Sequence, residues 1–105
     1  MDWESRVREQ MQDRVWVDFN AAWGERASAG GHYSQVSLAT MGSCRDLDRL
    51  GIELAEGMEL RIYMEDQEAD GRAGALVASG TVIHRPELGW MVEIADDAIE
   101  WVGCD

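Results

Sequence analysis

The acidic stretch from Asp66 to Gly71 carries the side chains whose spacing comes nearest to a known chemistry. Its carboxylates Asp66, Glu68 and Asp70 alternate at the first, third and fifth positions before a glycine, as in the opening of a calcium-binding EF-hand loop. The pattern then departs from that loop, because its twelfth position is Val77, where calcium needs a bidentate glutamate. We therefore predict no metal and no cofactor, and keep these three carboxylates as weak metal candidates against an exposed acidic hairpin loop.

A histidine and several carboxylates could form an acid–base site. His84 ends a predicted strand and could pair with Glu93 or Asp97, and the adjacent Asp96 and Asp97 could form a catalytic dyad. The alternatives are a hydrogen-bonded histidine and turn carboxylates that cap backbone amides. No catalytic motif accompanies these residues, so we predict that the protein is not an enzyme.

The cysteines and histidines give no zinc signature. Zinc ligands come as close pairs, whereas His32, Cys44, His84 and Cys104 lie far apart in the sequence. In a reducing cytosol the two cysteines are expected to be free thiols. Cys44, next to Arg45 in the first turn of a predicted helix, could be an activated nucleophile, but the sequence identifies no base for it.

Tryptophan is abundant, with five residues in a chain of 105. Partly exposed tryptophans are frequent anchors of protein interfaces, and the alternative is simple core packing with ring edges showing. The apolar residues of the first helix could dock on the chain's own sheet or on a neighbouring subunit. The predicted partner-binding residues are Trp3, Val7, Met11, Trp23, Trp90 and Trp101.

The charge distribution restricts the partners. The chain has no lysine, nine arginines and 21 acidic residues, for a net charge of −12. Residues 1–45 hold six acids and five arginines, whereas residues 46–105 hold fifteen acids and four arginines. Such an excess repels phosphate backbones and anionic lipid, so we predict no ordinary nucleic-acid binding.

The sequence is expected to hold neither a membrane span nor an export signal. Its first ten residues are charged, and no apolar run approaches the roughly 20 residues of a membrane span. We therefore expect a cytoplasmic protein without membrane contact. The arginine-only, alanine- and glycine-rich composition is typical of a bacterial genome of high GC content.

The segment before residue 24 is predicted to form a helix followed by a strand. Its apolar residues stand four apart, and four residues turn an α-helix by 400°, so the row drifts about 40° per step and cannot stay on one face. From Arg14 onward, Val15, Val17 and Phe19 alternate with their neighbours, which favours a strand. We predict a helix over residues 2–12 and a strand near 14–20.

The rest of the chain is predicted to form short strands. They lie near 33–40, 58–64, 75–85, 90–95 and 99–102, and the strand near 14–20 is expected to form a hairpin with 33–40. Residues 65–74 are expected to form an acidic loop, and Gly80 to mark a bulge or sharp bend.

A short helix is predicted over residues 44–50. Ser43 is expected to cap it, with Asp46 in the capping-box position and Gly51 at its end.

These elements predict one mainly β (α+β) domain over residues 1–105. We expect a small five- to six-stranded barrel or a strongly bent antiparallel sheet, with an N-terminal amphipathic helix and one short helix. The layout resembles Src-homology-3-like and OB-type barrels in architecture alone, and architecture does not carry function.

The function is not determined by the sequence, which identifies no small-molecule substrate. The leading hypothesis is a small non-enzymatic protein-binding or regulatory module, acting through a protein partner or self-association. The alternatives are an acidic inhibitor or immunity-type protein that neutralises a basic partner or imitates nucleic acid, and an enzyme with a site around His84, Asp96 and Asp97.

Overall fold

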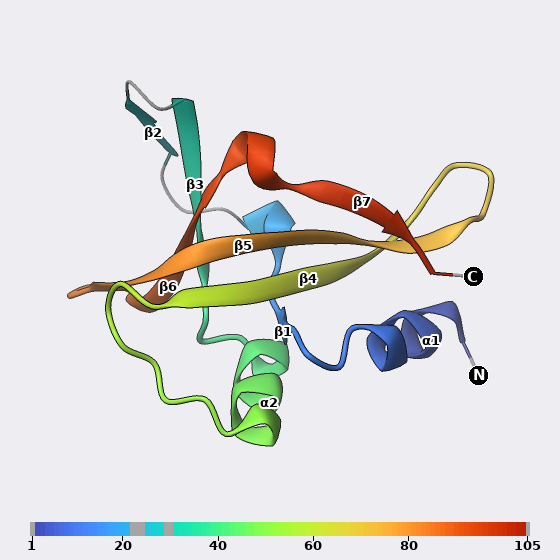
Figure 1. Ribbon diagram of the computed structural model, residues 1–105, viewed down its shortest axis with the longest axis horizontal. Helices are drawn as coiled ribbons and strands as arrows, with labels where there is room; N and C mark the ends of the chain where they lie inside the picture. The colour runs from blue at the N-terminus through green and yellow to red at the C-terminus, as the bar shows by residue number, and fades with distance from the viewer. Residues whose placement is uncertain (1, 22–24, 29–30, 105) are drawn as a thin grey trace.

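The computed structural model describes residues 2–21, 25–28 and 31–104, which form a bent β-sheet flanked by two α-helices (Figure 1). The strands are β1 (Val15–Trp16), β2 (Glu25–Ser28), β3 (Gly31–Ser37), β4 (Glu59–Gln67), β5 (Ala73–Arg85), β6 (Gly89–Ala95) and β7 (Glu100–Gly103). The helices are α1 (Trp3–Gln10) and α2 (Met41–Leu50), with 3-10 turns η1 (Phe19–Ala21) and η2 (Asp96–Ala98).

The sheet is open and mixed. Six strands follow the order β1-β4-β5-β6-β3-β2, and β7 pairs with β5 off this path. Because β1 and β2 lie at opposite ends of that order, the described strands do not close into a ring. The prediction of a mainly β fold with two helices is confirmed. Of the two predicted arrangements, the barrel is wrong, and the bent sheet is mixed instead of antiparallel because β1 pairs in parallel with β4.

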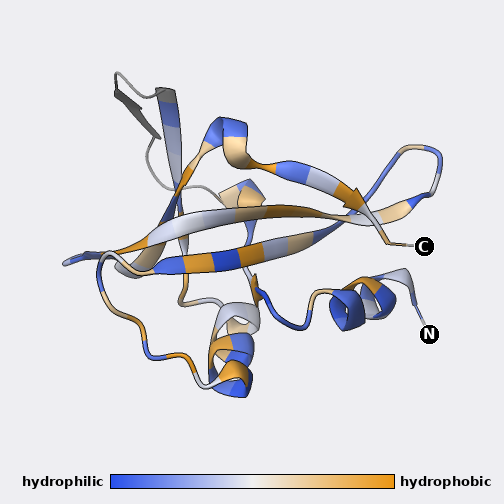
Figure 2. Cartoon of the chain, viewed as in Figure 1, coloured by the Kyte–Doolittle hydropathy of each residue, from blue (hydrophilic) through white to orange (hydrophobic). Residues whose placement is uncertain are grey.

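The long hairpin of β4 and β5 is the centre of the sheet. Its register runs without interruption from Glu59 opposite Thr81 to Gln67 opposite Ala73. The alternation of polar and apolar residues along β4 is visible in Figure 2. The expected loop over 65–74 is therefore shorter, because β4 continues to Gln67 and β5 begins at Ala73.

Gly80 marks a close approach between strands, and not a bulge. Its pairing with Leu60 keeps the register of β4 and β5 unbroken. A Cβ atom at Gly80 would lie 2.6 Å from the carbonyl oxygen of Glu93 and 2.6 Å from a methyl group of Val92. On the edge of β5 away from β4, β7 pairs before this glycine and β6 after it. The missing side chain lets β6 pass close to β5 there.

Two apolar clusters cover opposite faces of the β4–β5 hairpin. Ile62 belongs to the larger cluster and Tyr63 to the smaller one, and successive residues of a strand point to opposite faces. The smaller cluster lies under α1, whose Val7 is fully buried. Asp2 caps α1 by accepting a hydrogen bond from the Ser5 amide at 2.7 Å.

The predicted hairpin of 14–20 with 33–40 is wrong. β1 has only two residues and pairs in parallel with β4, Val15 opposite Ile62 and Trp16 opposite Tyr63. β3 instead pairs with β2 and β6. Val15 is buried in the larger cluster, so burial against β4 decided where this segment pairs.

Helix α2 begins earlier than predicted. Thr40 is its N-cap and accepts a hydrogen bond from the Ser43 amide at 3.0 Å, so the expected capping role of Ser43 is wrong. The helix ends at Gly51, whose φ of 67° suits a glycine. Neither this helix nor any other helix of the described segments is long and apolar enough to cross a membrane.

Candidate functional site

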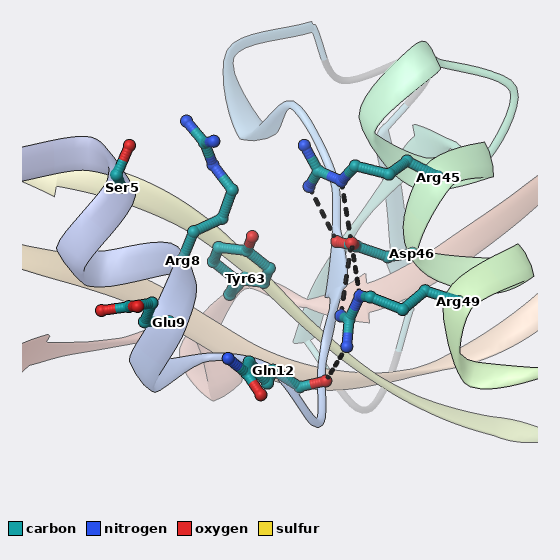
Figure 3. A pocket seen from close by; sticks show the side chains of 8 residues that line it. All are labelled: Ser5, Arg8, Glu9, Gln12, Arg45, Asp46, Arg49 and Tyr63. Atoms are coloured by element: carbon teal, nitrogen blue, oxygen red, sulfur yellow. Dashed lines mark hydrogen bonds and ion pairs between the residues drawn. The ribbon is translucent and has the colours of Figure 1, made fainter.

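A groove between α1 and α2 is the best candidate for a functional site (Figure 3). It has a volume of about 420 Å³ and is open to solvent. Its walls come from both helices and its floor from β4. The lining residues are Ser5, Arg8, Glu9, Gln12, Arg45, Asp46, Arg49 and Tyr63.

Helical periodicity places the wall residues. On α1, Ser5 and Arg8 are three residues apart and share a face, and Gln12 follows in the turn after the helix. On α2, Arg45 and Arg49 are four apart and also share a face. Three of the chain's nine arginines therefore meet around one groove.

Asp46 is the buried centre of this arrangement, with 2% of its surface exposed. It accepts a hydrogen bond from the Trp16 amide at 3.0 Å, and two from Arg45, at 2.9 Å from Nε and 3.0 Å from Nη2. Arg49 adds weaker contacts at 3.3 and 3.4 Å. Burial alone would raise the pKa of Asp46, but the hydrogen bonds from Arg45 and Trp16 outweigh it, so the pKa is lowered.

The same contacts seal the outer edge of β1. Trp16 belongs to the edge strand of the sheet, so its outward N–H and C=O have no neighbouring strand to bond. Asp46 accepts from that N–H, and the Ser43 hydroxyl donates to that C=O at 2.6 Å. Side chains of α2 thus take the place of a further strand, which explains why Ser43 and Asp46 are buried.

Two further contacts hold the helices in place, one to the segment after α1 and one to the sheet. Arg49 Nη1 donates to the Gln12 carbonyl at 2.7 Å, which ties α2 to the segment after α1. Arg8 Nε reaches Glu65 of β4 at 3.4 Å, and Glu65 also accepts a short hydrogen bond from the indole of Trp16. Each wall of the groove is therefore anchored to the strands beneath it.

Tyr63 supplies a neutral donor at the floor. Burial, together with the negative charges of Asp46 and Glu65, raises the pKa of Tyr63 to about 12. The phenol therefore stays protonated at neutral pH. Its oxygen faces the groove near Arg8 and Asp46 (Figure 3).

The lining is rich in hydrogen-bond donors. Three guanidinium groups, a phenol, a hydroxyl and an amide can donate, while Asp46 already uses its oxygens on its neighbours. Arginine's planar fork of N–H groups matches a carboxylate or phosphate. The arrangement therefore suits an anionic group, and its lining pairs no histidine or cysteine with a base.

The predicted metal candidates take structural roles. Asp70 accepts from the Arg72 amide at 3.0 Å in the turn, and Glu68 forms a 3.9 Å ion pair with Arg72. Asp66 lies within β4, opposite Gly74. In the parts of the chain that the structure describes, no three His, Cys, Asp or Glu side chains are grouped to hold a metal ion.

The predicted acid–base residues are not brought together. His84 pairs with Trp90 across the β5–β6 hairpin, and their rings meet edge to face with centroids 4.9 Å apart. Asp96 follows six residues after Trp90, about 20 Å along the strand, and accepts from the Ser34 hydroxyl. Glu93 accepts from Gln35 at 2.9 Å.

The two cysteines lie in different parts of the fold. Both are free thiols: Cys44 is exposed on α2, and Cys104 is buried in the cluster under α1. The side chain of Arg45 is directed to Asp46. His32 is exposed on β3.

The predicted partner-binding residues are scattered. Val7 and Met11 are buried against the chain's own sheet, and Trp3 packs beside them. Trp90 packs at the edge of the larger cluster, and Trp101 lies on β7, with the Arg72 guanidinium 5.3 Å from its ring. Trp23 lies outside the described residues.

Arg8, Arg45, Arg49 and Tyr63 were not predicted as residues of a binding site. One signal was present, since Arg45 and Arg49 stand four apart around an aspartate in a predicted helix. Nothing in the sequence placed Arg8 or Tyr63 beside them.

Comparisons with known proteins found no match to this chain. No protein family matches the sequence, and no curated protein or solved structure is significantly similar to the chain. The site therefore has to be interpreted from its own geometry.

Proposed function

We propose that this chain is a non-enzymatic protein-binding module whose partner docks in the groove between α1 and α2. The observation that carries the proposal is the gathering of Arg8, Arg45 and Arg49 around one groove, in a chain of net charge −12. Clustered arginines are typical of recognition surfaces, because guanidinium groups make directed, charge-assisted hydrogen bonds.

The anchoring of the groove supports binding rather than catalysis. Asp46 and Arg45 hold each other at 2.9 Å, and Arg49 is fixed to the Gln12 carbonyl at 2.7 Å. A wall whose side chains are already oriented loses little conformational entropy when a partner docks. The ionisable groups are used to build this wall, which leaves a preformed surface for recognition.

Affinity capture with two matched variants tests the proposal. Arg8 lines the groove, whereas Arg6 is exposed on the same helix and does not line it. We expect a protein from a cell lysate to be retained by the wild type and by Arg6→Ala, and to be lost with Arg8→Ala. Equal retention by all three proteins, or no retained protein at any salt concentration, would contradict the proposal.

An acidic inhibitor is the second candidate, supported by the net charge of −12. Such a protein needs its carboxylates on one face. The acids of residues 46–105 are instead spread over α2, the α2–β4 connection, the β4–β5 hairpin, the β5–β6 hairpin and the stretch from η2 to β7, which point in different directions in Figure 1. For an inhibitor, Asp96→Asn with Asp97→Asn would weaken capture of a basic partner, and Arg8→Ala would not.

A further inference from the structure

We infer that the groove recognises an oxyanion on the partner, presented by an acidic peptide segment and held between Arg8 of α1 and Arg45 of α2. This inference rests on the proposed function and names the chemical group that the groove takes. It follows from the donors that the groove leaves unused, from the charge of the lining and from the size of the cavity.

The first step is the donor count. A guanidinium carries five N–H groups. Arg45 bonds Asp46 through Nε and Nη2, which lie on one side of its fork, so Nη1 remains for a ligand. Arg8 contacts Glu65 through Nε, and its two Nη groups bond no other described residue. Both arginines therefore present N–H groups that a carboxylate or phosphate oxygen can accept.

The second step is the local charge. Among the lining residues, three arginines face two acids, Glu9 and Asp46. Asp46 is buried behind Arg45, and Glu65, which faces Arg8 from β4, is occupied by the Trp16 indole. The exposed charges of the lining are therefore three guanidinium groups and one carboxylate, that of Glu9, so the solvent side of the groove carries a positive excess.

The third step is size. A cavity of about 420 Å³ lies within the range of roughly 300–1,000 Å³ that ligand pockets commonly have, and exceeds the space of one carboxylate. Ser5 and Gln12 add neutral donors along the same groove, which can bond the carbonyl oxygens of the chain that carries the anion. Tyr63, which is only 1% exposed, forms the floor. The occupant is therefore an acidic peptide segment.

Titration of the isolated protein with defined peptides tests the inference. The probes are an acetylated, amidated tetraglutamate peptide, its tetraglutamine analogue, a phosphoserine peptide and inorganic phosphate, followed by amide chemical shifts and calorimetry. We expect tetraglutamate to bind the wild type and Arg6→Ala alike, and Arg8→Ala at least about tenfold more weakly. Arg45→Lys keeps the charge and loses the fork, so it should also weaken binding.

The remaining outcomes distinguish a carboxylate from a phosphate, and failure of the inference from failure of the proposed function. Tighter binding of the phosphoserine peptide supports the oxyanion and assigns it to phosphate. Equal binding of tetraglutamine, or equal losses in Arg6→Ala and Arg8→Ala, would overturn the inference. If no anionic peptide binds while Arg8 is still needed to retain a protein from a cell lysate, the inference fails and the proposed function stands. A dimer that Arg8→Ala dissociates would show that the occupant is a second copy of this chain, which also overturns the inference.

Discussion

Replacement of Asp46 by alanine should lower the free energy of unfolding by about 2–4 kcal/mol. The Trp16 amide would lose its acceptor at a nearly buried site, which costs about 1–3 kcal/mol. Arg45 and Arg49 would also lose their ion pairs, but their side chains are 45% and 40% exposed and can return to water, so this part adds only about 1 kcal/mol. Asp48 is exposed on the same helix, so Asp48→Ala should change stability by less than about 0.5 kcal/mol.

Urea unfolding followed by tryptophan fluorescence measures this difference at neutral pH. At roughly 5 °C per kcal/mol for a chain of this size, the melting temperature of Asp46→Ala should fall by roughly 10–20 °C. Because the pKa of Asp46 is lowered in the folded state, its contribution is complete above the unfolded pKa of about 3.9 and is lost as pH falls through the folded value. The gap between wild type and variant should therefore narrow below about pH 4.

Two results would refute this reasoning. If Asp46→Ala and Asp48→Ala are equally stable, α2 does not need the buried carboxylate to stay on β1. If the gap between wild type and Asp46→Ala stays constant down to the lowest pH at which both proteins fold, folding does not lower the pKa of Asp46.

Other substitutions test the sheet, the floor and the first helix. Gly74→Ala should cost about 1–3 kcal/mol in urea unfolding, because its Cβ would lie 2.5 Å from the ring of Trp101, whereas Gly103→Ala, with nothing closer than 3.4 Å, should cost much less. The Tyr63 phenol should ionise only as pH nears about 12, which the tyrosinate absorbance of wild type minus Tyr63→Phe reports; an ordinary titration near pH 10 would contradict its burial. Since that pKa is raised, the wild type should lose stability relative to Tyr63→Phe between about pH 10 and 12. Val7→Ala should cost roughly 2 kcal/mol, measured by the same unfolding assay, and an unchanged stability would mean that α1 does not dock on the sheet.

Part of the fold could be predicted because it is local. The helix expected over 2–12 compares with α1 at Trp3–Gln10, and the strand near 90–95 with β6 at Gly89–Ala95. Alternation and capping act within a few residues of each other, so they are readable along the chain. The prediction of a barrel was wrong because barrel closure depends on which strands pair, and turn residues do not determine the pairing of distant strands.

The candidate site shows most clearly which contacts a sequence pattern cannot predict. Asp46 stands three residues after Ser43, which matches a capping box, yet Thr40 caps the helix. The side chains of Ser43 and Asp46 instead bond the backbone of Trp16. Their partner stands 27 to 30 residues earlier in the chain. A capping pattern cannot reveal a contact of that separation, and here the exposed edge of β1 offered the buried polar groups a better partner.

The sequence by itself determined the local elements and the charge: a helix first, then strands with alternating faces, and an acidic second half. The tertiary structure alone decided that β1 joins β4 in parallel, and that Arg8, Arg45 and Tyr63 surround one groove. The reason is physical. Backbone geometry sets the spacing of side chains within one element, whereas the pairing of distant elements depends on which surfaces bury each other best once the chain closes on itself.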